Sequence, residues 1–195
     1  TLAIYQLLGF VAQAVLGGIT VLTKLNPITV SAHFLLSIPL VSGAISLRNR
    51  YLYKDHFQVS QTTKLAKNSF LIGTVMLLVI GTVVTGSGPL SGDVAAKRYQ
   101  LDAAKIAALH SYVAIIVLIS LIALLLAIRF YESTEVQMGI RNLIYGAFAI
   151  LIVQGAVGYR QFALGLPEIL VGMHLLGATL TWIFTWNIHL RMRNR

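Results

Sequence analysis

The sequence of 195 residues contains no cysteine, and it has only six acidic residues against fifteen basic ones. Without cysteine the chain has neither disulfide bridges nor thiolate ligands for a metal ion. Charged residues make up only 11% of the chain, hydrophobic residues make up 57%, and the mean hydropathy is +0.80. Soluble domains are far more charged and less apolar. The composition therefore predicts an integral membrane protein.

The net charge of +9 does not indicate a nucleic acid partner. The basic residues lie between long apolar runs rather than on one basic face or arm, so we interpret them as topology signals. Thr1 opens directly into an apolar run, with no basic segment or initiator methionine before it. A cleavable signal peptide is not apparent, and we expect a processed or truncated chain.

Six apolar runs are long enough to cross a bilayer, which requires roughly 20 residues. Polar loops are expected at 48–68 and 129–141, and a glycine-rich loop follows residue 85. Pro27 suits the first turn of the second span, and Pro39 within that span predicts a kink. The predicted fold class is an all-α integral membrane protein with helices over 2–22, 28–47, 69–85, 103–128, 142–159 and 167–190.

Alternation of the six spans divides the basic residues between two sides of the membrane. The richer side is cytoplasmic by the positive-inside rule, and it includes the C-terminus. The turns at Asn26-Pro27 and Leu166-Pro167 are then expected to face outward. The cytoplasmic set is Arg48, Arg50, Lys54, Lys64, Lys67, Arg129, Arg141, Arg191, Arg193 and Arg195, and the outer set is Lys24, Lys97, Arg98, Lys105 and Arg160.

One stretch of the chain occurs twice without a gap, as QAVLGGITVL…NPITVSAHFLLS and QGAVGYRQ…LPEILVGMHLLGA. Each copy is typical of a helix, a tight turn and a second helix. Four spans separate the copies, so both run the same way and a parallel repeat of four helices is predicted. Residues 69–195 would form a complete four-helix bundle, and residues 1–68 half of a second bundle and a cytoplasmic loop. The repeat matches Gln13 with Gln154, Gly17 with Gly158, and His33 with His174.

Three histidines are predicted to lie at one depth in the membrane. His33, His110 and His174 follow the expected helix starts by six or seven residues, which at 1.5 Å per residue is roughly 10 Å. Ionisable residues inside a membrane are costly and usually functional. A helix–helix hydrogen bond is the alternative for a single histidine. Three at one depth, two of them in a repeat, favour ligation.

The residues around these histidines favour haem over a bare metal ion. Zinc or copper would require further carboxylate, thiolate or histidine ligands, and no acidic residue lies within a predicted helix core. Haem requires only axial imidazoles from the protein. The small residues Gly172, Gly177, Ala107 and Ala108 suit a flat macrocycle, and Lys97, Arg98, Lys105 and Arg160 are either propionate partners or headgroup-facing charges.

The repeated patterns, together with GTVVTGSGPLSGD before LHS, resemble the haem A synthase family over essentially the whole chain. The resemblance implies eight transmembrane helices in two similar halves, each able to hold a haem between two histidines. It implies an oxidoreductase that converts a methyl group of haem O to the formyl group of haem A, for terminal oxidases. His110 and His174 would then ligate haem b, and His33 would ligate the substrate haem.

The same resemblance implies the plasma membrane of a bacterium, and it makes haem O synthase and a terminal oxidase assembly possible partners besides membrane lipid. The family's first two helices have no counterpart in this chain. They carry the other substrate-haem histidine, a nearby glutamate and, in many members, a cysteine pair. By the repeat, the partner of His33 would lie upstream of Thr1. Leu90 stands where similar sequences have histidine, so the loop GSGPLSG is interpreted as a glycine-permitted turn over the haem edge, not as a phosphate cradle.

Other polar and aromatic residues have simpler interpretations. His56 is expected to be solvated, and His189, Trp182 and Trp186 are expected at the cytoplasmic interface. Glu168 favours the dipole of the sixth helix. Gln13 and Gln154 serve either helix–helix hydrogen bonds or a haem pocket. Two functions remain as alternatives to the enzyme: a haem b-binding electron-transfer subunit without its own catalysis, and a structural membrane subunit.

Overall fold

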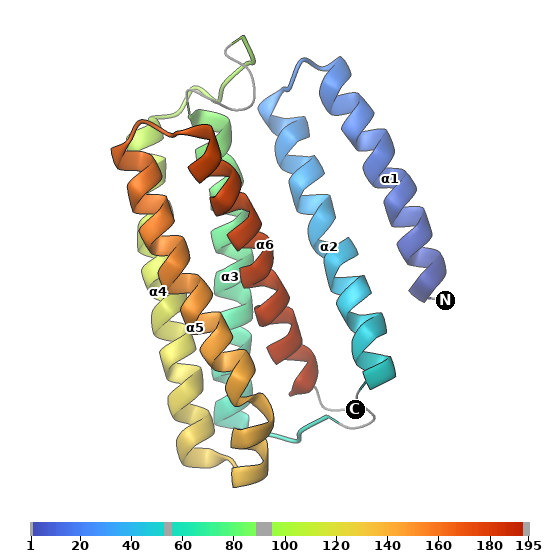
Figure 1. The fold of residues 1–195 in the computed structure, drawn as a ribbon, viewed down its shortest axis with the longest axis vertical. Helices are drawn as coiled ribbons and strands as arrows, with labels where there is room; N and C mark the ends of the chain where they lie inside the picture. Colours follow the sequence, from blue (N-terminus) through green and yellow to red (C-terminus); the bar gives the residue numbers. More distant parts are fainter. Residues whose placement is uncertain (1, 53–55, 89–94, 193–195) are drawn as a thin grey trace.

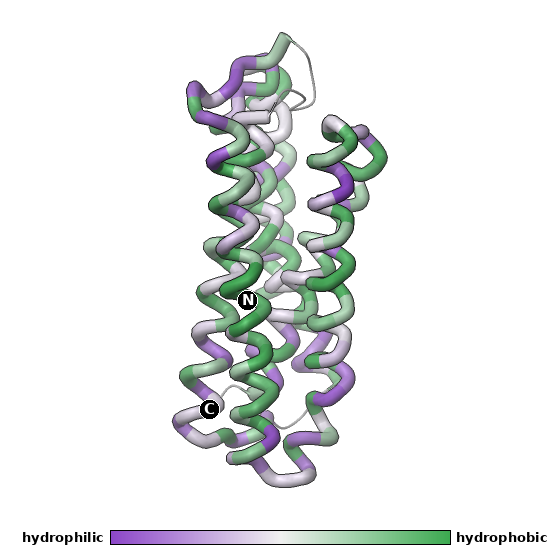
Figure 2. Tube along the Cα trace, turned by 90° about the vertical axis from the view of Figure 1, so that its left-hand side faces the viewer, coloured by the Kyte–Doolittle hydropathy of each residue, from purple (hydrophilic) through white to green (hydrophobic). Residues whose placement is uncertain are grey.

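The computed structural model describes residues 2–52, 56–88 and 95–192. These residues form six α-helices and no β-strand (Figure 1). Each helix is long and apolar enough to cross a membrane, which confirms the predicted all-α, multi-pass class. Figure 2 shows hydrophobic residues along the middle of the helices and more hydrophilic ones toward their ends. The helices are α1 (Leu2–Leu22), α2 (Pro27–Leu52), α3 (Gln61–Ser87), α4 (Ala103–Tyr131), α5 (Thr134–Ala163) and α6 (Glu168–Arg191).

Two of the predicted loops are largely helical. The loop predicted at 48–68 is wrong because α2 continues to Leu52 and α3 already begins at Gln61. The loop predicted at 129–141 is wrong because α5 begins at Thr134. In both cases a serine caps the helix: the Ser60 hydroxyl accepts from the Thr63 amide, and the Ser133 hydroxyl accepts from the Val136 amide. Hydrophobicity marks the membrane span, whereas these caps mark the helix start.

The last four helices form a closed ring of contacts, in which each of α3, α4, α5 and α6 packs against two of the others. Among the described residues, α4 and α6 have no Cα atoms within 8 Å of each other, so they lie diagonally across the ring. Helix α2 packs on α3 and α6. Of the described helices α1 packs only on α2, and it lies at the edge of the molecule in Figure 1. The two N-terminal helices therefore form an appendage to the ring.

The buried apolar core lies in one half of this ring, toward the turn between α4 and α5. Its largest fully buried side chains come from all four helices, and they include Phe70, Leu121, Ile140 and Ile188. Burial of such side chains is worth about 1.5–3 kcal/mol each in water, whereas in a bilayer close packing contributes the stability. The core ends at Val117 on α4, because no residue of this helix before Val117 is buried.

The α1–α2 turn and the α5–α6 turn have the same backbone conformation. Lys24 and Leu25 have φ of 52° and 54°, and the matching Gly165 and Leu166 have φ of 73° and 65°. The amide of Leu25 donates to the Thr20 carbonyl at 3.0 Å, and the amide of Leu166 donates to the Gln161 carbonyl at 2.7 Å. Left-handed residues satisfy the last carbonyls of a helix and reverse the chain. Both turns lie at the same end of the molecule (Figure 1).

Polar side chains join α2 to α6 across the middle of the molecule. The Trp182 indole donates to the Ser42 hydroxyl at 2.8 Å, and the Trp186 indole donates to the Ser46 hydroxyl at 3.0 Å. Trp182 is only 4% exposed, so its predicted place at the membrane interface is wrong. The His189 ring stacks on Trp186, with ring centroids 5.1 Å apart. The two indole–hydroxyl hydrogen bonds attach α2, and with it the N-terminal appendage, to the ring.

Candidate functional site

The structure brings together two of the three predicted ligand residues. His110 lies on α4 and His174 on α6, in the half of the ring that is nearer the α5–α6 turn. Their ring centroids are 6.3 Å apart, and the ring planes make an angle of 69°. Because α4 and α6 are diagonal, these side chains meet across the interior of the ring rather than along a helix–helix interface. The pair therefore faces a common interior space.

The spacing of the two imidazoles suits a metal ion between them. A metal lies about 2 Å from an imidazole nitrogen, which itself lies about 1 Å from its ring centre, so two ligated rings would be about 6 Å apart. The observed 6.3 Å between His110 and His174 agrees with that value, and it also lies in the range of an edge-to-face contact between two rings. No group of three or more His, Cys, Asp or Glu able to hold a metal occurs in residues 2–52, 56–88 and 95–192. Two imidazoles alone suffice only where another group, such as a porphyrin, supplies the remaining ligands.

Each of the three histidines His33, His110 and His174 packs closely against a glycine of the preceding helix. A Cβ atom added at Gly158 would lie 3.1 Å from Cε1 of His174, and one added at Gly81 would lie 3.2 Å from Cε1 of His110. The corresponding distance from Gly17 to His33 is 3.1 Å. A methyl group at any of these positions would press on the imidazole ring. The absence of a side chain therefore allows the ring to pack against the backbone of its neighbour.

This packing leaves one nitrogen of each ring buried and without a hydrogen bond. The Nδ1 atoms of His33, His110 and His174 have no hydrogen-bond partner among the described residues, although Nδ1 of His56, outside the helices, has none either. Buried polar atoms are normally satisfied, and those without a partner require an explanation. An imidazole that served only as a helix–helix hydrogen bond would show a partner. The simpler interpretation, in which each imidazole makes a helix–helix hydrogen bond, therefore has no support from these three rings.

The half of the ring around the two paired histidines is less tightly packed than the other half. No residue at positions 103–116 of α4 is buried, and the first buried residue of α6 is Gly177. Gly172 is exposed and has no atom within 4 Å of an added Cβ, but it precedes His174 by two residues and so faces another side of α6. A side chain at Gly177 would collide with the amide of Gln154. Neither glycine therefore shows open space beside the paired histidines.

His33 has the same local setting but lies apart from the other two histidines. It projects from α2, which does not contact α4, and no ring contact joins it to another histidine within the described part of the chain. The Gln13 amide donates to the His33 carbonyl at 2.9 Å and to the Ser37 hydroxyl at 2.7 Å. Of the two interpretations of Gln13, the structure therefore shows the helix–helix hydrogen bond.

The four basic residues considered for propionate binding are arranged differently from one another. Arg98 donates to the carbonyls of Ala96 and Lys97, at 2.8 Å and 3.2 Å. Lys105 pairs with the exposed Asp102 at 3.7 Å, and an exposed pair of this kind contributes little stability. Lys97 and Arg160 are exposed. All four lie toward the end of the molecule where the histidines are found.

The remaining sequence predictions have mixed outcomes. Glu168 lies in the first turn of α6, as predicted, although the helix begins at this residue rather than at Pro167. His56 lies outside the helices and is half-buried rather than fully solvated. Lys54, Leu90, Arg193 and Arg195 lie outside the described residues, as does most of the loop GSGPLSG.

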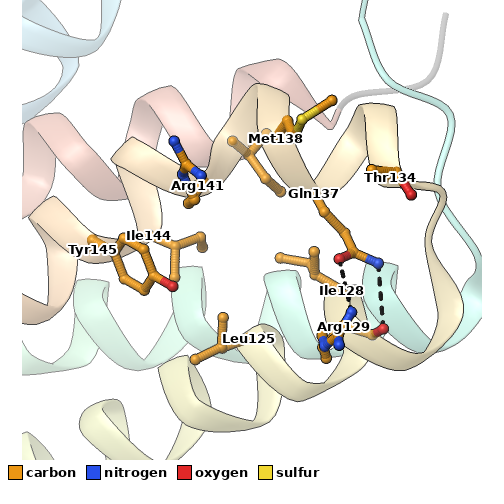
Figure 3. A pocket seen from close by; sticks show the side chains of 10 residues that line it. Leu125, Ile128, Arg129, Thr134, Gln137, Met138, Arg141, Ile144 and Tyr145 are labelled. Atoms are coloured by element: carbon orange, nitrogen blue, oxygen red, sulfur yellow. Dashed lines mark hydrogen bonds between the residues drawn. The ribbon is translucent and has the colours of Figure 1, made fainter.

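Two features of the structure were not predicted. The contact between Gly81 and His110 depends on the register of α3 against α4, and no sequence repeat includes it. A cavity between α4 and α5, at the end opposite the histidines, is lined by two arginines (Figure 3). Comparisons with protein families, with curated proteins and with solved structures find no match to this chain.

Proposed function

We propose that this chain is a haem-dependent membrane oxidoreductase of the haem A synthase type, which oxidises a methyl group of haem O to a formyl group. The observation that carries the proposal is the pair of His110 and His174, with ring centroids 6.3 Å apart across the interior of the ring. The sequence resemblance supplies the reaction. The product, haem A, would serve a terminal cytochrome oxidase.

In this proposal His110 and His174 would hold haem b through their imidazoles. The residues fit such a group because both rings are oriented by a glycine and neither Nδ1 atom has a partner among the described residues. When bound, a bis-imidazole haem supplies a centre that accepts and donates single electrons. Lys97, Lys105 and Arg160, at the same end of the molecule, are available for its propionates.

His33 is the proposed ligand of the substrate haem. The α1–α2 hairpin that carries it shares its turn conformation and its glycine contact with the α5–α6 hairpin that carries His174. These likenesses support a parallel repeat of four-helix units, with residues 69–195 as one unit and residues 1–68 as half of another. The second ligand of the substrate haem would then come from the other half of that unit.

Membrane placement follows from the same proposal. The turns next to His33 and His174 would face the outer side of a bacterial plasma membrane, and the C-terminus would be cytoplasmic. The excess of basic residues at the end with Arg48, Lys64 and Arg129 supports this orientation. Haem O synthase is a possible neighbour because it would deliver the substrate.

A spectrum of the purified protein tests haem binding. Two axial imidazoles give sharp low-spin bands in a reduced-minus-oxidised spectrum, and we expect those bands in the wild type. His110→Ala and His174→Ala should each abolish or strongly weaken haem retention, whereas His56→Ala should leave it unchanged. Equal haem content in all three variants would show that the assigned pair is not the ligand pair.

A second function is favoured by one observation. Within the described residues only one pair of histidine rings is in contact, and His33 has no such partner. A membrane subunit that carries haem b and transfers electrons, without its own catalysis, would need that pair alone. Conversion of haem O to haem A by the purified protein separates the enzyme from the electron carrier. Absence of any haem bands would instead indicate a structural subunit.

A further inference from the structure

The cavity between α4 and α5 lies beside the turn that joins these helices, at the bottom of the molecule in Figure 1. Both apolar and charged side chains line this cavity. Ile128, Ile140 and Ile144 form a buried apolar floor, and Arg129 and Arg141 project from the two helices at its margin (Figure 3). On α5, residues 137, 141 and 145 follow one another at intervals of four, so they share one face.

The two arginines at this cavity have no carboxylate partner within residues 2–52, 56–88 and 95–192. The nearby Glu132 is already engaged, because it accepts from the Ser60 amide at 2.9 Å and from the Ser60 hydroxyl at 2.8 Å. Arg129 donates to the Gln137 side chain at 3.4 Å, which holds its guanidinium near the cavity. Most of the five donors of each guanidinium therefore remain available.

Arg141 lies at the border between the polar first turns of α5 and its apolar span. It lies seven residues after Thr134, the first residue of α5, which corresponds to roughly 10 Å along the helix. Its side chain is exposed in the isolated chain, as is Tyr145 one turn further into the span. An arginine at such a border lies near the headgroup level, where it can bind an anion. A phosphate group supplies that anion, and two of its oxygens can accept a bidentate pair of hydrogen bonds from the planar guanidinium.

We propose that the groove between α4 and α5 binds an anionic phospholipid, with its phosphate between Arg129 and Arg141. The acyl chains would follow the apolar surface of Leu125, Ile144 and Tyr145 toward the middle of the membrane. Basic pockets between transmembrane helices bind anionic lipid headgroups in this way. The site lies at the other end of the molecule from the histidines, so it does not depend on haem binding.

The test compares lipids of equal acyl chains on the purified full chain. Native mass spectrometry and thermal unfolding would be measured with phosphatidylglycerol, with phosphatidylcholine and with inorganic phosphate alone. We expect retention and stabilisation by phosphatidylglycerol only. Arg129→Gln and Arg141→Gln should each weaken its binding about fivefold, and the double variant about 25-fold. Arg50→Gln, which removes an exposed arginine in the last turn of α2, outside the cavity, is the matched control.

Several outcomes would overturn the proposal. These are equal binding of phosphatidylcholine, equal stabilisation by inorganic phosphate, and unchanged lipid binding in the double variant. Circular dichroism of each variant checks that the helices are retained. The double variant Arg129→Lys with Arg141→Lys keeps both charges and should keep most of the lipid binding. If the glutamine double variant does not fold, the lysine double variant and the two single glutamine variants decide the result. Haem content should be the same in every variant.

Discussion

Glycine decides where an imidazole lies at three positions of this chain. The sequence repeat pointed to Gly17 and Gly158, since both precede a histidine by sixteen residues in matching hairpins. It could not point to Gly81, which precedes His110 by a different separation. Contact between two helices depends on how far one slides along the other, and that register is set by packing rather than by local sequence. The histidines and the repeated glycines were therefore predictable, but the contact of Gly81 with His110 was not.

Substitution of these glycines should move the imidazoles. Gly158→Ala places a methyl group 3.1 Å from Cε1 of His174, which is tighter than ordinary contact, so the ring must shift. We expect an altered low-spin spectrum and weaker haem retention, measured by a reduced-minus-oxidised difference spectrum. Gly81→Ala should act in the same way on His110.

Gly155→Ala is the matched control on the same helix, because an added Cβ there meets nothing within 4 Å. Alanine is about 1 kcal/mol more favourable than glycine within a helix, so this variant should be slightly more stable and spectrally unchanged. If Gly155→Ala and Gly158→Ala gave identical spectra and haem content, the glycine would have no part in placing His174.

At the level of the helices, hydropathy located all six spans but misplaced two helix starts. The predicted bounds of α1 hold, and α4 begins at Ala103 as predicted, where Asp102 accepts from the amides of Ala104 and Lys105. In contrast, α3 and α5 each begin eight residues before their predicted starts of 69 and 142. Their first turns are polar, so hydropathy did not include them. Attention to Ser60 and Ser133 as caps would have placed both starts correctly.

The two matching turns allow a paired prediction of stability. Lys24 and Gly165 occupy equivalent positions with φ of 52° and 73°. A left-handed conformation costs a non-glycine residue roughly 1 kcal/mol. Lys24→Gly should therefore stabilise the chain by up to about 1 kcal/mol, and the gain is reduced because glycine raises the conformational entropy of the unfolded chain. Gly165→Ala should destabilise the chain by a similar amount. Thermal unfolding in one detergent measures both, and shifts in the same direction would contradict the shared turn conformation.

At the level of the whole molecule, the common end of the three histidines could be predicted, whereas the contact between α2 and α6 could not. Alternation of the spans is enough to place His33, His110 and His174 toward one end. The hydrogen bonds of Ser42 with Trp182 and of Asn49 with Asn187 join residues that are far apart in sequence. A tryptophan near the end of a span is typical of the membrane interface, and only the position of α2 shows that Trp182 is buried instead.

The arrangement of α3 gives a direct test of the membrane topology. Gln61 is the first residue of α3, Gln100 lies beyond its other end, and both are exposed. The chain has no cysteine of its own, so Gln61→Cys and Gln100→Cys each introduce a single thiol. In the proposed orientation, which follows from the basic residues near Gln61, this residue is cytoplasmic. An impermeant maleimide should then label Gln100→Cys in intact cells, and Gln61→Cys only after permeabilisation.

Leu126→Cys completes this experiment, since Leu126 is exposed on the apolar surface of α4 and should be shielded by lipid from the reagent. Ser60 is less suitable for labelling, because its hydroxyl caps α3 and binds Glu132. Labelling of both glutamine positions from the same side would mean that α3 does not cross the membrane. If instead Gln61→Cys were labelled in intact cells and Gln100→Cys only after permeabilisation, α3 would still cross the membrane. The histidine end would then be cytoplasmic, and the proposed outward-facing haem site would be wrong.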